Sequence, residues 1–262
     1  MTLTSTLTAA AALLLVLPVS AQSVNGVSFV NGLVLSGAAA DLSGDSSVNG
    51  RNGYFSDIYY DRARNEWWGL SDRGPGGGTL AYETRVQRFT LDVNFTTGAI
   101  SNFQVAQSIK FSNGSSAMSG LAPSNPALLG SAFDPEGFVV NPKNGNLLVG
   151  DGYGPSLNEF NRQGQRVKTY PVPANLVPKV GAAIHYNAVP APTVPGDPAA
   201  TAGREYNRGL EGLAVSPDGN FAYAMLQNGT VQDGWTATAR GAYTRIVKFD
   251  TSTGLAVALY AY

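Results

Sequence analysis

The sequence predicts an all-β protein, a β-propeller built from four-stranded blades, and three observations lead to that fold class. Glycine (31 residues) and proline (15) are abundant and charged residues make up only 13%, which is typical of many short strands joined by tight turns. One strand–turn–strand pattern recurs three times along the chain. Beyond residues 1–21, no stretch keeps the 3.6-residue apolar periodicity of a helix. A β-sandwich with long loops is the alternative fold.

The recurring pattern begins with an acidic residue, passes through an apolar strand and a turn, and ends in a second strand that leads to a polar residue and a glycine corner. Its copies run from Asp57 through DRARN to Asp72, from Glu136 through NPKNG to Asp151, and from Glu211 through SPDGN to Gln227. Asn-Gly and Asp-Gly turns between apolar runs indicate β-hairpins. Each copy is therefore predicted to be a hairpin.

A further strand pair follows each hairpin, in residues 85–108, 157–173 and 244–262. Four strands in a unit of roughly 50–75 residues are typical of a propeller blade. About three to four blades are expected, the fourth only in part near residues 26–40, whereas a propeller typically has about four to eight. We therefore expect an incomplete propeller, truncated at its C-terminus. The proline- and alanine-rich loop 174–206 is expected to cross the top or rim.

Residues 1–21 are predicted to be a signal peptide, because an apolar run ends in Val19-Ser20-Ala21, a small-x-small cleavage signal. The mature propeller domain is then 22–262. The run is shorter than the ~20 apolar residues of a spanning helix, so we expect no membrane association after cleavage. Three Asn-x-Ser/Thr sequons fit a secreted, extracellular glycoprotein. Their asparagines are Asn94, Asn113 and Asn228.

The composition excludes several classes of function. The net charge of −1 and the lack of a basic block argue against nucleic-acid binding. The chain has no cysteine and a single histidine, His185, so disulfides, thiolate chemistry and a histidine-based zinc site are excluded. There is no Gly-x-Ser-x-Gly motif to support a serine nucleophile.

The acids at the hairpin ends are candidate metal ligands. The innermost strand of a blade lines the central channel, so Glu136 and Glu211, at the starts of such strands, are expected at the channel mouth. Asp72, Asp151 and Gln227 end the second strands, which in antiparallel hairpins lie beside the starts of the first. Oxygen ligands from several blades suit Ca²⁺. Taken singly, each acid is more simply explained as a cap of its turn.

Two arginines, Arg73 in SDRGPGGG and Arg208 in NRGLEG, are expected near the same mouth. Guanidinium groups bind phosphate or carboxylate in a bidentate manner, so both are candidate ligands of an anionic substrate. The alternative is a structural ion pair with the neighbouring acid, Asp72 or Glu211.

These motifs together resemble the phytase-like domain family, described as having the esterase-like activity of phytase. The likeness is carried by SDRGPGG (71–77), DPEGFVV (134–140), GDGYGPSLNEFNRQGQRVKTYPVP (150–173), NRGLEGLAVSPDG (207–219) and AMLQNG (224–229). The resemblance implies a secreted or periplasmic β-propeller with phosphoester hydrolase activity. The site positions that it implies are Asp72, Arg73, Glu136, Asp151, Tyr153, Asn207, Glu211 and Gln227.

The chain departs from the family at one position of this site. The family usually reads Asp-Glu-Tyr-Gly-Pro where this chain has Gly152 between Asp151 and Tyr153. A carboxylate is thereby missing, which puts catalysis in doubt. The family domain also normally continues beyond residue 262, in agreement with the expected missing blades.

The first functional hypothesis is a secreted, metal-dependent phosphoric ester hydrolase that acts on a small phosphate ester or other anionic substrate, with the protein a monomer. Its catalytic residues would be Asp72, Glu136, Asp151 and Glu211, with Ca²⁺ held by Glu136, Asp151 and Glu211. Its substrate-binding residues would be Arg73, Tyr153, Asn207, Arg208 and Gln227. Two alternatives remain: a non-catalytic propeller that binds a ligand or partner, and a calcium-dependent lactonase or esterase.

Overall fold

A computed structural model describes residues 26–189, 198–234, 239 and 241–262. The predicted signal peptide, 1–21, lies outside these residues. The chain divides into two units, Met1–Asn31 and Gly32–Tyr262. The described part of the first unit has no regular secondary structure, and all that follows concerns the second. Within the described ranges, no helix is long and apolar enough to cross a membrane.

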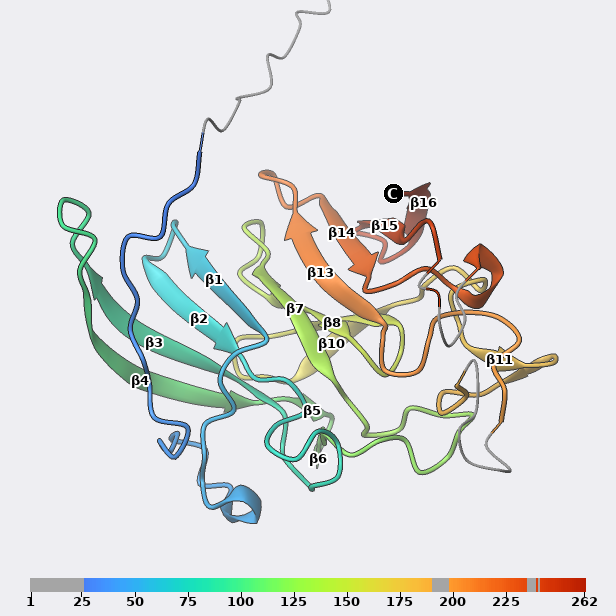
Figure 1. The fold of residues 1–262 in the computed structure, drawn as a ribbon, viewed down its shortest axis with the longest axis horizontal. Coiled ribbons are helices and arrows are strands. Elements are labelled where there is room, and N and C mark those ends of the chain that lie inside the picture. Colours follow the sequence, from blue (N-terminus) through green and yellow to red (C-terminus); the bar gives the residue numbers. More distant parts are fainter. Residues whose placement is uncertain (1–25, 190–197, 235–238, 240) are drawn as a thin grey trace, which may run out of the picture. The chain divides into compact units, whose positions relative to one another are not determined.

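Three four-stranded antiparallel sheets make up the second unit, each a meander in which every strand pairs with the next along the chain (Figure 1). Blade 1 contains β1 (Asp57–Asp61), β2 (Glu66–Leu70), β3 (Arg85–Val93) and β4 (Ile100–Lys110); blade 2 contains β7 (Pro135–Val140), β8 (Leu147–Asp151), β9 (Ser156–Phe160) and β10 (Arg166–Tyr170); blade 3 contains β13 (Leu210–Val215), β14 (Phe221–Leu226), β15 (Arg245–Asp250) and β16 (Ala256–Ala261). The predicted propeller blades are confirmed.

The first strands of the three blades, β1, β7 and β13, lie side by side, as inner strands of a propeller do (Figure 1). Gly137 makes the approach of β13 to β7 possible. A Cβ atom at this position would lie 2.3 Å from the backbone oxygen of Glu211, far inside van der Waals contact. Any larger residue would push the two inner strands apart, and with them the acids at their ends.

Two apolar cores fill the spaces between the blades, and the alternation of side chains along β7 and β8 supplies both. Phe138 and Val149 point into the core shared with blade 1, which includes Trp68. Val139 and Leu148 point into the core shared with blade 3. A strand buried on both faces needs a continuous apolar run, and this explains the sequence FVV and LLV on either side of the NPKNG turn.

Shorter elements connect the blades: the 3₁₀ helices η1 (Ser46–Val48) and η2 (Val231–Asp233) and the strand pairs β5–β6 (Ser112–Asn113, Ser116–Ala117) and β11–β12 (Lys179–Val180, Ala183–Ile184). The last pair lies in the loop predicted at 174–206.

The partial blade expected near 26–40 was wrong, because residues 26–39 form no strand. Apolar residues there, such as Val34 at 96% exposure, have no partner strand that would bury them.

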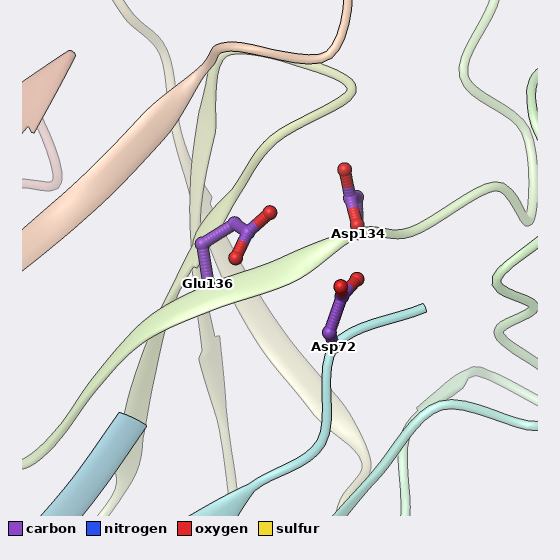
Figure 2. A group of neighbouring side chains, drawn as sticks. All are labelled: Asp72, Asp134 and Glu136. Carbon is purple, nitrogen blue, oxygen red and sulfur yellow. The ribbon is translucent and has the colours of Figure 1, made fainter. Parts of the chain in front are cut away.

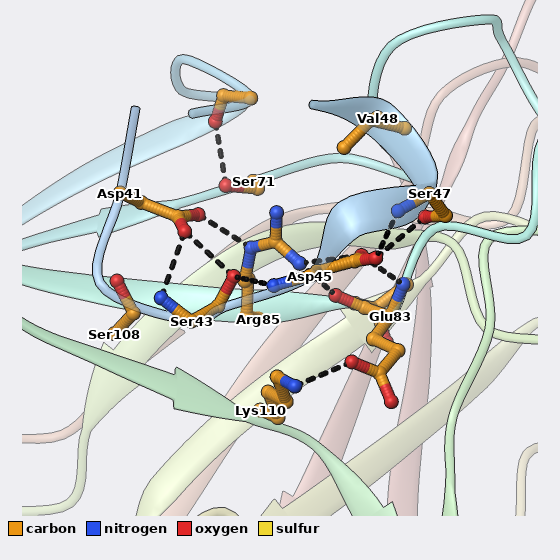
Figure 3. Close-up of polar contacts among 12 residues, drawn as sticks. Asp41, Ser43, Asp45, Ser47, Val48, Ser71, Glu83, Arg85, Ser108 and Lys110 are labelled. Carbon is orange, nitrogen blue, oxygen red and sulfur yellow. Dashed lines mark hydrogen bonds and ion pairs between the residues drawn. The ribbon is translucent and has the colours of Figure 1, made fainter. Parts of the chain in front are cut away.

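The segment before β1, residues 40–56, which we call the strap, is fixed to blade 1 by Arg85 at the start of β3 (Figure 3). The Arg85 side chain is fully buried. Its Nε lies 2.6 Å from Asp41 Oδ2 and its Nη1 lies 2.9 Å from Asp45 Oδ2. The guanidinium also lies 4.0 Å from the centre of the Tyr82 ring. Burial raises the pKa of Asp45, but hydrogen bonds from Ser47 and Arg85 outweigh it and lower the pKa to about 2.

Candidate acidic site

Three carboxylates meet where blades 1 and 2 adjoin (Figure 2). Asp72 follows β2, Asp134 directly precedes β7, and Glu136 is the second residue of β7. One carboxylate oxygen from each lies within 4.8 Å of the other two. Asp134 and Glu136 are two residues apart at the start of a strand, so their side chains leave the backbone on the same side. Figure 2 shows these two carboxylates turned toward the space above Asp72.

Asp134 is the unusual member of this group. Its side chain is fully buried, and neither carboxylate oxygen has a hydrogen-bond partner among the described residues. The nearest cation, Arg73 Nη1, is 3.7 Å from Asp134 Oδ2, which is beyond hydrogen-bond distance. A buried carboxylate without partners is costly unless it is protonated or binds a cation. Asp134 therefore marks a place that requires either a proton or a bound cation.

Burial and the closeness of the carboxylates also raise the pKa values of Asp134 and Glu136. Burial raises the pKa of Asp134 strongly, the adjacent Asp72 carboxyl adds to the rise, and so does the charge of Glu136. Burial raises the pKa of Glu136 to about 8, against the opposing hydrogen bond from Ser56, and the charges of Glu211 and Asp72 contribute. Crowded carboxylates repel each other's negative charge, so Asp134 and Glu136 hold their protons more tightly.

Glu211, on β13, brings a fourth carboxylate to the group from blade 3. Burial raises its pKa, and the charge of Asp72 adds to the effect while Arg208 opposes it. Its Oε2 atom is buried and has no hydrogen-bond partner in the described part of the chain. Glu211 of blade 3 thus lies close enough to the acids of blades 1 and 2 for their charges to interact.

Arg73 is the cation closest to the acids. Its Nη1 donates a hydrogen bond to Asn207 Oδ1, and its guanidinium carbon lies 5.6 Å from the centre of the Tyr153 ring. Its Nε is buried and has no hydrogen-bond partner within the described residues, the nearest acid being Asp72 at 3.8 Å. Arg73 is thus held from two sides, and its Nε donor is unused within the described residues.

Asp151, predicted as a metal ligand, is not one of the three clustered carboxylates. Its Oδ1 accepts hydrogen bonds from the backbone nitrogens of Asp134 (3.1 Å) and Tyr153 (3.0 Å), and its Oδ2 accepts one from Ser156 Oγ (2.8 Å). These bonds use its acceptors on the chain itself. Burial raises its pKa to about 6, although the three bonds oppose the rise. Asp151 fixes the backbone from which Asp134 projects.

The buried Arg204 fixes the adjoining corner, which no sequence pattern indicated. Its guanidinium donates to the backbone oxygens of Tyr153, Gly154 (3.1 Å) and Tyr186 (2.9 Å). Tyr153 is itself buried, and its hydroxyl donates to the oxygen of Gly120 at 2.6 Å. The corner after β8 is therefore a rigid support for the acids and for Arg73.

Gly152 faces the acids directly. A Cβ atom on it would lie 2.5 Å from Asp134 Oδ2 and 3.1 Å from Glu136 Oε1. In this chain the Asp134 carboxylate therefore occupies the space that a side chain at position 152 would enter. The carboxylate that the family resemblance implies at position 152 is absent, and the Asp134 carboxylate occupies the space that it would need.

Replacing Gly152 by alanine should displace the Asp134 carboxylate, since the new methyl group and Oδ2 cannot share the space. We expect cation affinity to fall by about tenfold, the lower end of the range for disturbed partners of metal ligands. Isothermal titration calorimetry with Ca²⁺ measures this. Gly212→Ala is the matched control, because its Cβ would meet only Met225 Cβ at an ordinary 3.6 Å. Equal affinities of the Gly152→Ala protein and the wild type would contradict the steric argument.

Two other predicted substrate contacts have different surroundings, and the charge of Arg208 reaches Glu211, whose pKa it lowers. Arg208 Nε is 2.5 Å from Glu205 Oε2, so this arginine forms the structural ion pair, but with Glu205 rather than Glu211. Gln227 is exposed just after β14.

Asp57, the acid that opens the first hairpin, links two blades. Its Oδ2 accepts a hydrogen bond from the Phe138 nitrogen at 2.7 Å and so ties blade 1 to β7.

The sequon asparagines lie in three settings. Asn94 is exposed in the turn after β3, and Asn113 is exposed in β5. The Nδ2 atom of Asn228 donates to Glu205 Oε2 at 2.7 Å. Glycosylation of the three remains a prediction.

Sequence reasoning missed the roles of Asp134 and Ser56. The sequence contains a signal for Asp134, because acids two residues apart at a strand start share one face of the strand. It contains no signal for Ser56, since the contact of Ser56 with Glu136 joins residues 80 positions apart.

The fold and the acidic site define a class, a β-propeller protein with carboxylates from several blades gathered at the ends of its inner strands. Residues 51–262 match the family model described as Phytase-like, esterase-like activity of phytase. The chain belongs to this family.

Three further proteins are similar to this chain. An uncharacterized secreted protein of Arthroderma benhamiae is 30% identical over 128 residues, which are 46% of this chain and 24% of that protein. The chain therefore corresponds to only part of that relative. Among solved structures, Kuenenia stuttgartiensis hydrazine synthase is 13% identical with a TM-score of 0.32, over 84% of this chain and 52% of the other. A Bacteroides uniformis protein provisionally described as a 6-phosphogluconolactonase is 14% identical with a TM-score of 0.33, over 79% and 55%. Neither structural likeness is close enough to bear on function.

Proposed function

We propose that this protein is a secreted hydrolase of phosphate esters that depends on a divalent cation bound at the acidic site. The observation that carries the proposal is Asp134, a fully buried carboxylate that has no hydrogen-bond partner among the described residues and lies beside two further carboxylates. Membership of a family described by its esterase-like activity supports the reaction class. The relative described as a secreted protein supports the location.

The donor set fits a hard cation. The group offers carboxylate oxygens from Asp72, Asp134 and Glu136, and the sequence supplies no cysteine and one histidine. Oxygen-only ligation favours Ca²⁺ or Mg²⁺ over zinc or copper. We propose Ca²⁺ held by these three residues, which replaces the set Glu136, Asp151 and Glu211 expected from the sequence. When bound, the cation would polarise a phosphoryl oxygen and lower the pKa of a water molecule.

The remaining side chains have complementary roles in this proposal. Arg73, with an unused donor at Nε, would bind the phosphate beside the acids, and Asn207 and Tyr153 hold it in place. Glu211 would accept the proton of the attacking water, since its Oε2 has no hydrogen-bond partner among the described residues and burial raises its pKa, which makes it a stronger base than an ordinary carboxylate. Asp72 has 44% of its side chain accessible, so it lies toward the solvent from which a substrate would approach.

The test is phosphate release from phytate and from p-nitrophenyl phosphate, by protein purified without metal and by the same protein with Ca²⁺ added. We expect release only with the cation and a loss in the Glu211→Gln variant. No release by folded protein under either condition would overturn the proposal.

A second candidate function is the non-catalytic binding of an anionic ligand or partner, and Gly152 favours it. The family carboxylate absent at this position would be the missing catalytic group. Cation binding without turnover on phosphate esters, carboxylic esters and lactones would support this function. Turnover of carboxylic esters or lactones alone would instead support the calcium-dependent esterase.

The stability of the metal-free protein should depend on pH in a way that the cation reverses. Glu136 keeps its proton in the folded state up to about pH 8, whereas its ordinary pKa is 4.5. The folded state therefore binds more protons between these values, and stability falls as the pH rises through them. A bound cation replaces the proton. We expect saturating Ca²⁺ to raise the melting temperature by about 5 °C or more at pH 8 and by less than about 1 °C at pH 5. Differential scanning calorimetry at both pH values measures this, and equal shifts would contradict it.

A further inference from the structure

The strap ends at the acidic site. Ser56, its last residue, donates a hydrogen bond from Oγ to Glu136 Oε2 at 2.6 Å. The bond joins blade 1 to blade 2 and connects a serine that no motif contains to a proposed cation ligand. We propose that Ser56 is a positioning residue that orients Glu136 for cation binding, an inference that rests on the proposed function of the site.

The two oxygens of Glu136 have different surroundings. Oε2 is occupied by the Ser56 hydroxyl. Oε1 faces Gly152, where the position of a Cβ atom would be 3.1 Å from Glu136 Oε1 and 2.5 Å from Asp134 Oδ2. The oxygen not bonded to Ser56 is thus the one that shares this space with Asp134. Ser56 holds Glu136 as a ligand through Oε1 alone, because rotation of the carboxylate would break the bond at Oε2.

The backbone of Ser56 is itself fixed, as a positioning residue requires. Its nitrogen donates to the oxygen of Leu70 at 2.8 Å, which extends the β1–β2 pairing by one residue. The preceding Phe55 stacks on Phe89 at a centroid distance of 5.5 Å and an interplanar angle of 11°. The Phe55 ring also lies over Gly69, where any Cβ atom would be 2.4 Å from it.

The rest of the strap is anchored further back. Ser71 Oγ donates to the oxygen of Gly53 at 2.5 Å, and Arg85 binds Asp41 and Asp45 (Figure 3). Ser71 directly precedes Asp72, so the strap contacts both chain segments that bring acids from blade 1 and blade 2. The strap therefore forms one wall of the site.

Removal of the hydroxyl in Ser56→Ala should weaken Ca²⁺ binding by about tenfold, the lower end of the range for side chains that orient a metal ligand. Isothermal titration calorimetry measures this without any substrate. Ser56→Thr keeps a hydroxyl and should retain an affinity near that of the wild type. Ser252→Ala is the matched control, since it removes an equal 2.6 Å bond from a hydroxyl to a carboxylate, that of Asp250, in a turn of blade 3. Wild-type affinity in Ser56→Ala, or an equal loss in Ser252→Ala, would overturn the proposal.

A crystal structure of Ser56→Ala separates this proposal from the proposed function. If the wild type binds no cation, the proposed function fails. The position of the Glu136 carboxylate in the variant still shows whether Ser56 orients it. A carboxylate of Glu136 that rotates in Ser56→Ala and keeps its place in Ser56→Thr supports positioning by the hydroxyl. An unchanged Glu136 in Ser56→Ala overturns it.

Discussion

The Asp134→Asn protein is expected to fold as the wild type does and to lose its response to Ca²⁺. Asn has the shape of the protonated acid, and burial with neighbouring negative charge already raises the pKa of Asp134 strongly. The metal-free variant should therefore melt at or slightly above the wild-type temperature. Cation affinity should fall by roughly a hundredfold or more, because even partners of metal ligands are worth 10–100-fold. Calorimetric titration and melting curves with and without Ca²⁺ measure both effects.

This pair of results distinguishes a cation site from a structural cluster of acids. If Asp134 only maintained the fold, its replacement would destabilise the protein with or without Ca²⁺. Asp92→Asn makes the same chemical change at an exposed carboxylate of blade 1, which accepts a bond from Asn102, and should leave the Ca²⁺ response intact. A full Ca²⁺-induced rise in melting temperature in Asp134→Asn would rule out this residue as a ligand.

The Arg85→Met protein should lose about 3–5 kcal/mol of its free energy of unfolding, since it leaves two buried acids without their cation. Arg85 is fully buried and pairs with both Asp41 and Asp45. Methionine fills much of the same space, so the loss would come from the uncompensated charges of the acids rather than from a cavity. Urea denaturation measures the change.

The double replacement Asp41→Asn and Asp45→Asn in the Arg85→Met background should recover part of this loss, because it removes the unpaired charges. Arg62→Met, at an exposed position, is the control and should change stability by less than about 0.5 kcal/mol. A loss of under about 1 kcal/mol in Arg85→Met would show that the strap is held mainly by its backbone bonds.

The blades could be predicted from the sequence because their information is local. The turns NPKNG and SPDGN, with apolar runs on either side, specify hairpins whose residues are close along the chain. The partial blade expected near 26–40 was wrong because local information alone was used there. Apolar residues form a strand only where a neighbouring sheet buries them.

The acids at the hairpin ends were predicted as a set, because a repeated structural unit places equivalent residues at equivalent ends. The sequence could not separate Asp151, whose oxygens accept hydrogen bonds from two backbone nitrogens and from Ser156, from Asp134, whose oxygens have no hydrogen-bond partner in the described part of the chain. Both follow or precede an apolar strand beside a glycine or a proline. The difference arises from the way β7 and β8 pack against blade 1 on one face and blade 3 on the other, and this packing is decided by the tertiary structure.

The sequence by itself determined the hairpins, the order of the strands and the residue types available for a site, because these depend on the backbone preferences of neighbouring residues. Only the tertiary structure decided which acids meet, that Ser56 binds Glu136, and that Arg85 binds Asp41 and Asp45. These contacts join residues 40 to 80 positions apart. Their distances are set by how closely the blades pack, at glycines such as Gly137 and Gly152, and no local pattern encodes that spacing.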